Sequence, residues 1–549
     1  MHFIYTSLFI LFFAGCSAYD DTDRVPSVEG NITDKASWYA DESNDLLRVD
    51  ISIEVPNDFE CAPFDDHTAP LRPCTLEDID GDSDATDDYE PELHVKVGTP
   101  DYAPAYAVFK QKGKSTRHAL QKSYRVKLDS KDVLQYKERT WQLNKHPNDD
   151  SRIRNKLSFD LFKGIPNFTS SKTRFVHLYI DDVDYGLFTH VERTDEYFLR
   201  NRGWNDEDRI YKAQNFDFRY TDDLAVDSKG NPLYPEKFEA IIEPSNGDDY
   251  SLFIEMLKAI NSTSTDSEFT EEFNKYFDRN NYITWMAVNI IMANKDTVSQ
   301  NFFLYNPLFT EKFYFMPWDY DGIGRETYKY SKWELGIGTW WGIPLHRRFL
   351  KIEQNRKDLD KMVDLIREKY ITPQKVQALL DQYKKIVEPF ILSAPDNSLE
   401  YDEWKKTFDI QPQQVDINIQ NYKDQIGSPM PFWQSASYEN GILKLKWEVA
   451  VDFEGDKIVY DVYCADNPDF NNTIVSQIGL DESTPNVSVA EWGEFSFEKK
   501  VDLTLGSHLF MKVIAREKDN SDHWQLAFDK EVVIDDVHYF GVLEFIVKP

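Results

Sequence analysis

The chain has few cysteines, no excess of positive charge and no apolar run long enough to span a bilayer. Of its 549 residues only 4 are cysteines, and they form no Cys/His spacing of the kind that binds structural zinc. Asp and Glu number 96 against 62 Lys and Arg, which gives a formal net charge of −34. A charge of that sign repels nucleic acids and anionic membrane surfaces. We therefore expect no nucleic-acid partner.

The first residues are typical of an export signal. Residues 3–13 form a mostly apolar run, too short to cross a membrane, and Ala14-Gly15-Cys16 follows it. Small residues just before a cysteine resemble a bacterial lipobox, which predicts a signal peptide over residues 1–15 and a lipid on the Cys16 thiol. The protein would then be a lipoprotein at the cell surface or outer membrane, held to the membrane by that anchor only. No Lys or Arg precedes the run and Phe13 replaces an aliphatic residue, so a plain secretory signal is the alternative. Both interpretations predict export.

The other cysteines differ in their surroundings. Cys61 and Cys74 flank a short loop that contains prolines and has no regular pattern. After export, such a pair is expected to form a disulfide that closes the loop. Cys464 lies in an alternating, strand-like stretch, where a small buried side chain is its simplest role.

Residues 77–92 are dense in aspartate. Asp78, Asp80, Asp82 and Asp84 alternate as the ligands of a calcium loop do. Counted from Asp78, however, the glycine stands fourth instead of sixth, and no acid stands twelfth. This spacing favours a solvated acidic loop over a calcium site.

The length predicts more than one domain. Residues 16–45 are polar and acidic and are expected to form a tether. Residues 46–192 mostly alternate as strands do, with one helix predicted after Asp149. The clearest helical stretches follow at residues 273–294, 351–370 and 373–392.

The character of the chain changes again at its C-terminal end. Residues 431–549 contain short alternating strands, with an Asn440-Gly441 hairpin signal. They predict a small all-β sandwich, most like a fibronectin type III module. We expect this accessory domain to fold on its own, because no clustered chemistry lies in it and its strands look self-contained.

Two short segments carry most of the chemistry. Asp296 stands five residues before Asn301, and Pro317-Trp318-Asp319-Tyr320-Asp321-Gly322 follows later. Protein kinases arrange a catalytic carboxylate and magnesium ligands in this way. Residues 302–306 and 311–316 are aromatic and strand-like, so a β-hairpin would place both acids at its ends. Taken alone the pattern is short, since Asp and Asn also cap turns.

Further motifs surround these segments. In chain order they are residues 112–117, 122–127, 151–159, 185–192, 294–301 and 317–321. In that order they resemble the spore coat protein H (CotH) kinase family, atypical secreted or spore-associated protein kinases, over roughly residues 46–425. The resemblance implies an α+β class: an atypical protein-kinase-like bilobal fold over residues 46–430, with a β-rich N-lobe and a helical C-lobe, followed by the small all-β sandwich.

The same resemblance implies a function. The chain would be an exported kinase that uses ATP and Mg²⁺, with Mn²⁺ as the other candidate ion, to transfer the γ-phosphoryl group to Ser or Thr hydroxyls of a surface or coat protein. Asp296 is the candidate catalytic base, which orients the acceptor hydroxyl. Asn301 and Asp319 are candidate metal ligands, since hard oxygen donors suit Mg²⁺. Asp321 is a further ligand or a turn cap, with equal weight.

Candidate nucleotide contacts lie upstream. The turn Gly113, Lys114, Ser115, Thr116 and Arg117 replaces a glycine-rich phosphate loop with one glycine, two hydroxyls and cations. Lys127 resembles the phosphate-anchoring strand lysine of kinases. Arg125 shares its strand face, and Lys122 takes the other. Residues 152–164 offer no clear equivalent of the helix glutamate that pairs with that lysine. The resemblance implies that Glu192 marks the hinge near the adenine, and a solvent-exposed acid at a helix start is the alternative.

Two other functions remain open. One is a non-catalytic adhesion or assembly protein on the same scaffold, and the other is a nucleotidyltransferase that modifies a protein or another acceptor. The joint presence of Asp296, Asn301 and Asp319 favours an enzyme, whereas the scarcity of ATP outside cells favours the scaffold.

Overall fold

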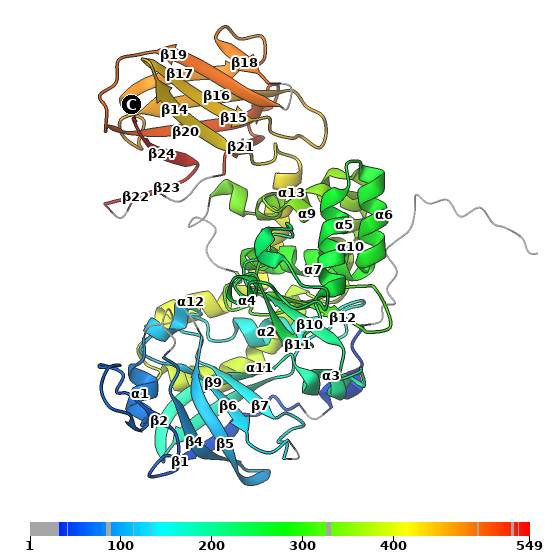
Figure 1. Ribbon diagram of the computed structural model, residues 1–549, viewed down its shortest axis with the longest axis vertical. Coiled ribbons are helices and arrows are strands. Elements are labelled where there is room, and N and C mark those ends of the chain that lie inside the picture. Colours follow the sequence, from blue (N-terminus) through cyan, green and yellow to red (C-terminus); the bar gives the residue numbers. More distant parts are fainter. Residues whose placement is uncertain are drawn as a thin grey trace, which may run out of the picture.

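The computed structural model describes residues 32–548, except residues 41, 84–88, 114, 132, 325–330, 491–492, 529–531 and 536. Within them the chain mixes helices and strands, and its C-terminal part is all-β (Figure 1). This confirms the α+β class. The predictions that concern the signal peptide, Cys16, Asp84 and Lys114 lie outside the described residues.

Strands of the N-terminal half close into a barrel. In barrel order they are β1 (Leu47–Ile53), β4 (Glu92–Thr99), β5 (Tyr102–Lys112), β6 (Ser123–Leu128), β7 (Thr140–Asn144), β9 (Val183–Glu192) and β8 (Thr173–Ile180). β1 and β8 run parallel and close the ring. Because side chains alternate along each strand, Val49, Leu93, Phe109 and Val126 meet in one buried core inside it.

A second sheet carries the predicted hairpin. Its order is β11 (Ile242–Asn246), β10 (Arg209–Ala213), β12 (Phe302–Asn306) and β13 (Tyr314–Pro317). Phe302 pairs with Pro317 across the antiparallel β12 and β13. The hairpin is therefore confirmed, and its register brings Asn301 and Trp318 to the same end of it.

Helices build the following part around an aromatic core. They are α2 (Arg154–Phe162), α3 (Glu196–Arg202), α4 (Pro235–Glu239), α5 (Ser251–Ser262), α6 (Asp266–Tyr276), α7 (Arg279–Met292), α8 (Gly338–Trp341), α9 (Pro344–Lys351), α10 (Glu353–Lys369), α11 (Pro373–Ile391), α12 (Tyr401–Asp409) and α13 (Gln411–Ile426). α7 is buried along most of its length, and the ring centroid of its Trp285 lies 4.3 Å from that of Phe315 on β13. The stretch predicted as one helix at 273–294 is divided, because the chain leaves α6 at Phe277 in an extended conformation before Asp278 caps α7.

The C-terminal strands form two sheets that share one core. The first has the order β14 (Gln434–Glu439), β15 (Ile442–Glu448), β19 (Glu494–Lys500), β18 (Val487–Val489). The second has the order β17 (Thr473–Leu480), β16 (Ile458–Ala465), β20 (His508–Glu517), β21 (Trp524–Leu526), with β24 (Val542–Ile546) paired to β20 and a short hairpin, β22 (Val532–Ile534) and β23 (Val537–Tyr539), beside it. Asn440 and Gly441 both have positive φ, at 51° and 78°, as the predicted hairpin turn requires. Cys464 is fully buried.

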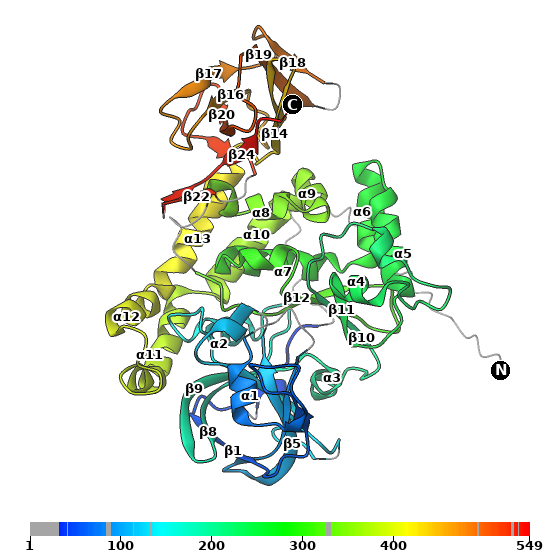
Figure 2. The same cartoon turned by 60° about the vertical axis from the view of Figure 1, so that its left-hand side comes forward.

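This C-terminal sandwich, residues 432–548, packs against the helices (Figures 1 and 2). Phe528 is only 7% exposed and belongs to the same core cluster as α7. Its ring centroid lies 5.2 Å from that of Trp333, and that of Phe453 lies 5.5 Å from that of Trp341. The sandwich thus has a core of its own and also packs aromatic rings against the helices; its independent folding stays a prediction.

The segment predicted as a tether is not free over its described part. Trp38 is buried and packs edge-on against Trp204, with 5.7 Å between ring centroids. The Asp34 carboxylate accepts hydrogen bonds from Tyr39 and Thr169, and its burial raises its pKa to about 7. Residues 32–40 thus lie against the barrel and helices, because their few apolar side chains outweigh their acidic composition.

The acidic stretch is also not a solvated loop where it is described. Residues Leu76–Gly81 form the short helix α1, in which Asp78 caps the first turn and binds Arg72 at 2.7 Å. Asp82 pairs with Arg117 at 2.9 Å, and Asp80 accepts the Tyr124 hydroxyl at 2.7 Å. These carboxylates are occupied by protein partners, so the stretch is neither solvated nor arranged as a calcium loop.

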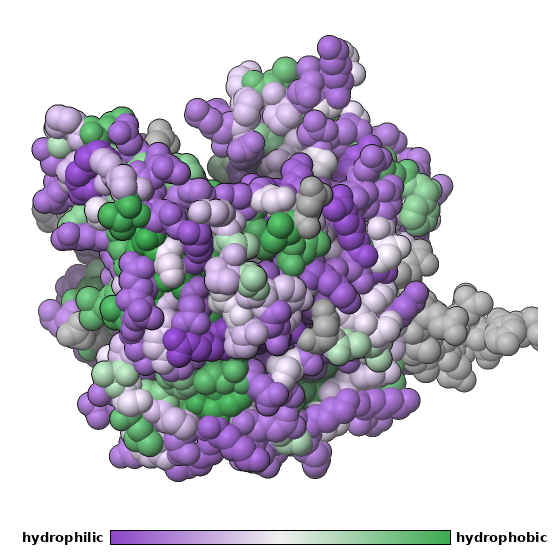
Figure 3. Space-filling model, turned by 90° about the horizontal axis from the view of Figure 1, so that it is seen from below, coloured by the Kyte–Doolittle hydropathy of each residue, from purple (hydrophilic) through white to green (hydrophobic). Residues whose placement is uncertain are grey.

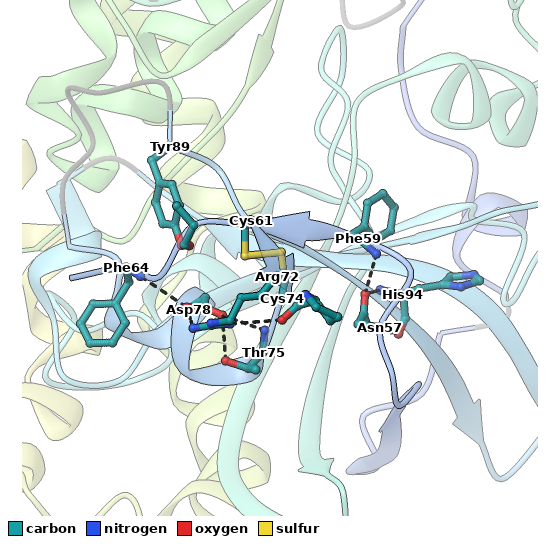
Figure 4. Close-up of a disulfide and its surroundings, with 12 residues drawn as sticks. Asn57, Phe59, Cys61, Phe64, Arg72, Cys74, Thr75, Asp78, Tyr89 and His94 are labelled. Atoms are coloured by element: carbon teal, nitrogen blue, oxygen red, sulfur yellow. Dashed lines mark hydrogen bonds and ion pairs between the residues drawn. A yellow bond between two sulfur atoms is a disulfide. The ribbon is translucent and has the colours of Figure 1, made fainter. Parts of the chain in front are cut away.

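Cys61 and Cys74 form a disulfide beside α1 (Figure 4). Cys61 ends the two-residue strand β2 (Glu60–Cys61), and Cys74 directly follows its partner strand β3 (Arg72–Pro73). The disulfide anchors the start of α1, because Thr75 follows Cys74 directly and its N–H binds the Asp78 carboxylate.

The surface is largely polar. Viewed from the barrel end, hydrophilic side chains cover most of the face and enclose smaller apolar areas (Figure 3). Among the helices of the described residues, none is both long and apolar enough to cross a membrane.

Phe528→Ala tests whether the sandwich is integral to the helical part. We expect a loss of about 3 kcal/mol of unfolding free energy, since the change leaves a cavity between Trp333 and Trp433. Phe309→Ala is the control, because Phe309 is 81% exposed and its loss should cost under about 0.5 kcal/mol. Equal urea midpoints for both variants would show that the contact contributes nothing.

Candidate functional site

A cavity of about 830 Å³ lies between the barrel and the β10–β13 sheet. Its lining comes from β5, β6 and the loop between them, from β7 and residues 146–148, from residues 193–194, from β10 and β11, and from residues 296–303 and 318–321. Asp296, Asn301, Asp319 and Asp321 all line it. The three aspartates and the asparagine of the two sequence segments therefore line the same cavity.

Backbone strain surrounds the acids. Ala293, which ends α7, has φ of 50°, and Asn301 and Asp319 have φ of 56° and 55°. Residues other than glycine rarely adopt this left-handed conformation, and where they do the cost is of order 1–3 kcal/mol. Such strain clusters at functional sites, where it can orient a side chain toward the site in a way that an unstrained turn cannot.

Asp296 and Asp319 are held differently. Asp296 is half-buried in the short turn Lys295–Val298, and its carboxylate makes no hydrogen bond to any described residue. The Asp319 carboxylate accepts the Asn155 side-chain N–H at 3.3 Å, and Asn155 Oδ1 accepts the backbone N–H of Tyr320 at 2.9 Å. The side-chain amide of Asn155 on α2 therefore orients Asp319.

Lys112 is the cation that sequence reasoning did not assign. Its ammonium donates to Asn144 Oδ1 at 2.6 Å and lies 5.5 Å from the centre of the Trp318 ring. Burial lowers the pKa of Lys112 to about 8, although Asp319 and Asp321 favour its charged form. Strand alternation from Gln111 could have indicated that Lys112 and Lys110 share one face, but not that this face opens to the cavity.

The loop after Lys112 borders the cavity through Gly113, Thr116 and Arg117. Gly113 has φ of 112°, and a Cβ there would lie 2.1 Å from the Thr116 hydroxyl, so only glycine fits. The Arg117 guanidinium donates to the Gly113 carbonyl at 3.0 Å and to Asp82 at 2.9 Å. Arg117 therefore braces the loop. Ser115 is described in its backbone only.

Two predicted nucleotide contacts lie elsewhere. Arg125 lines the cavity, but Lys127 is exposed and does not. Glu192 is buried, pairs with Arg202 at 3.0 Å and accepts the N–H of Lys172. The predictions of Lys127 as phosphate anchor and Glu192 as adenine hinge are corrected, because one side chain points to solvent and the other is consumed by an ion pair. Lys122, the third candidate, donates to backbone carbonyls and also does not line the cavity.

His146 is a further lining residue without a sequence signal. It is 5% exposed with φ of 51°, and its Nδ1 lies 4.0 Å from Asp321 Oδ2. Burial lowers the pKa of His146 to about 4, against the pull of Asp149 and Asp319, so the imidazole is neutral at pH 7.

Comparison with known proteins agrees with these motifs. The family model described as CotH kinase protein matches residues 109–426, more than half of the chain. The chain is also 25% identical, over 347 residues, to the inner spore coat protein H of Bacillus subtilis strain 168. The aligned region covers 61% of this chain and 94% of that protein. All of the cavity lining except Glu90 falls within the matched range.

Lys112→Met should weaken binding of Mg–ATP about tenfold or more, the usual scale for losing a charge-assisted hydrogen bond. Its melting temperature should not fall, because the change removes a charge that burial disfavours. Lys127→Met is the matched control and should bind normally. Calorimetry on both variants decides, and a larger effect at Lys127 would restore the original assignment.

Proposed function

Because the chain belongs to the CotH kinase protein family, we propose that it is an exported kinase that transfers the γ-phosphoryl group of ATP to Ser or Thr hydroxyls of a surface or coat protein. The observation that carries this proposal is the convergence of Asp296, Asn301, Asp319 and Lys112 on one cavity. In this proposal the barrel is the β-rich lobe of a kinase, and the β10–β13 sheet with the helices forms the second lobe. The cavity lies between the barrel and that sheet.

The donor set fits a magnesium ion. Asp319, Asp321 and Asn301 line the cavity and offer carboxylate and amide oxygens, the hard ligands that Mg²⁺ and Mn²⁺ accept. A bound ion would neutralise charge on the phosphates. Asn155 keeps Asp319 oriented toward that position. Lys112 and the backbone of Gly113 offer positive charge and an N–H donor to the phosphate oxygens.

Asp296 is the group best suited to the acceptor. Its carboxylate is not engaged by another described side chain, and it lies in the same cavity as the metal ligands. In the proposal it accepts a hydrogen bond from the acceptor Ser or Thr and takes its proton as the oxygen attacks the γ-phosphorus.

The acceptor class and the location rest on the relative and on the first residues. The relative is named as an inner spore coat protein, which supports a coat or surface protein as the acceptor. The apolar segment before Cys16 supports export, either as a lipoprotein or as a secreted protein.

Label transfer separates the candidate reactions. Purified protein is incubated with generic Ser/Thr-containing proteins and ATP labelled at either the γ- or the α-phosphate. A kinase transfers only the γ-label. Transfer of the α-label would instead identify a nucleotidyltransferase, and no transfer of either label would favour a scaffold.

Two substitutions separate the roles of the acids. Asp319→Ala should lose magnesium-dependent ATP affinity together with turnover, because the metal that neutralises the phosphates is no longer held. Asp296→Asn should keep ATP affinity within about threefold while turnover falls about a hundredfold or more, the usual scale for losing a general base. Calorimetry and the transfer assay are run on each variant. Near-normal turnover in Asp296→Asn would contradict the assignment.

A further inference from the structure

The turn that carries Asp296 is tied to a distant part of the chain. Lys295 Nζ lies 2.6 Å from Glu334 Oε1, and the other oxygen of that carboxylate accepts the N–H of Ser331 at 2.9 Å. The two charged side chains are 29% and 18% exposed. Because water competes less at a partly buried pair, this contact restrains the turn more than a surface ion pair would.

The two segments also enclose a shared space. Asn294 and Lys295 on one side, and Glu334 and Thr339 on the other, line one small cavity of about 30 Å³. The ion pair is therefore one part of a contact between the Asp296 turn and residues 331–342.

Residues 331–338 are held in turn by α13. The side-chain oxygen of Gln425 accepts the N–H of Gly338 at 2.6 Å, and its amide nitrogen donates to the carbonyl of Lys332 at 3.3 Å. A Cβ on Gly338 would lie 1.9 Å from the carbonyl oxygen of Trp333, so the segment is folded tightly on itself.

The C-terminal sandwich also contacts the same segment. The ring centroids of Trp333 and Phe528 lie 5.2 Å apart, and Lys332 Nζ lies 4.1 Å from the centre of the Trp524 ring. The family match ends at residue 426, so the sandwich lies outside it. An added domain thus contacts, through two consecutive residues, the segment that braces Asp296.

We infer that Glu334 is a positioning residue for Asp296, and that the C-terminal sandwich keeps Glu334 in place through Lys332 and Trp333. The inference rests on the proposed function, in which Asp296 takes the proton of the acceptor. Asp319 does not depend on this brace, because Asn155 of α2 orients it. Loss of the brace should therefore impair turnover and spare nucleotide binding.

Glu334→Gln tests whether Glu334 positions Asp296. We expect kcat to fall about tenfold, with the KM and the calorimetric Kd for Mg–ATP within about twofold of wild type. Lys295→Met should behave alike, and the double variant should be no worse than either single change, since both remove the same contact. An equal loss of ATP affinity, additive effects, or an unchanged kcat would each contradict the role.

Trp524→Ala and Phe528→Ala test whether the sandwich keeps Glu334 in place. Both should lower kcat as Glu334→Gln does and leave the KM and Kd for Mg–ATP unchanged. Leu445→Ala is the matched control, because Leu445 is fully buried in the sandwich core and touches the brace nowhere. We expect Leu445→Ala to lower the melting temperature of the sandwich. Its kcat, measured at about 25 °C, should stay normal. A similar kcat loss in Leu445→Ala would mean that sandwich instability alone lowers activity.

Hydrogen exchange gives a readout that needs no activity. Amides of residues 294–301 should exchange several-fold faster in Glu334→Gln and in Phe528→Ala than in wild type, and at the wild-type rate in Leu445→Ala. A wild-type protein that transfers no label would overturn the proposed kinase function only. Unchanged exchange of residues 294–301 in both brace variants would overturn the positioning inference, whether or not the protein is active.

Discussion

The arrangement of the candidate site depends on one clamp between α7 and the β12–β13 hairpin. The buried Asn281 side chain accepts the N–H of Phe315 at 2.6 Å and donates to the carbonyl oxygen of the same residue at 3.0 Å. β13 is the last strand of its sheet, so without Asn281 these backbone groups would be buried unpaired, at a cost of about 1–3 kcal/mol each. Since α7 leads to the Asp296 turn and β13 leads to Asp319, the clamp sets how far apart the two acids lie.

The charge of the cavity lining differs from that of the whole chain. A protein of net charge −34 lines this cavity with the cations Lys110, Lys112, Arg125 and Lys212 as well as with the acids Asp296, Asp319 and Asp321. Such a mixture suits a polyphosphate with a metal ion, because the acids attract the ion and the cations attract the phosphates. The lowered pKa of Lys112 indicates that its placement disfavours its own charge, as is common at functional sites.

Local sequence patterns predicted the strands and helices, whereas contacts between residues remote in sequence determine which side chains line the site. The β12–β13 hairpin, α10 and α11 follow from alternation and helical periodicity over neighbouring residues. Lys127 was preferred over Lys122 and Arg125 for its local Val-Lys context, and Lys112 was not considered, because which side chains face the cavity depends on how the barrel closes. Asp34 looked like part of an acidic tether because its partner Thr169 is remote in sequence. The role of Asn155 was not predicted, because residues 152–164 were searched only for the glutamate that pairs with the strand lysine, and Asp319, which Asn155 contacts, is remote in sequence.

The C-terminal sandwich shows that a family boundary and a folding boundary can differ. The family match ends at residue 426, yet Phe528 belongs to the core that contains α7. Arg356 of α10 also stacks on Phe453 of the sandwich, 4.0 Å from the ring centre. Without the sandwich, Trp333 and Trp341 would lose the aromatic partners that cover them, and an exposed pair of that kind favours association or local unfolding. The helical part of this chain therefore shares buried packing with a domain outside the matched region, and this packing includes the segment next to Glu334.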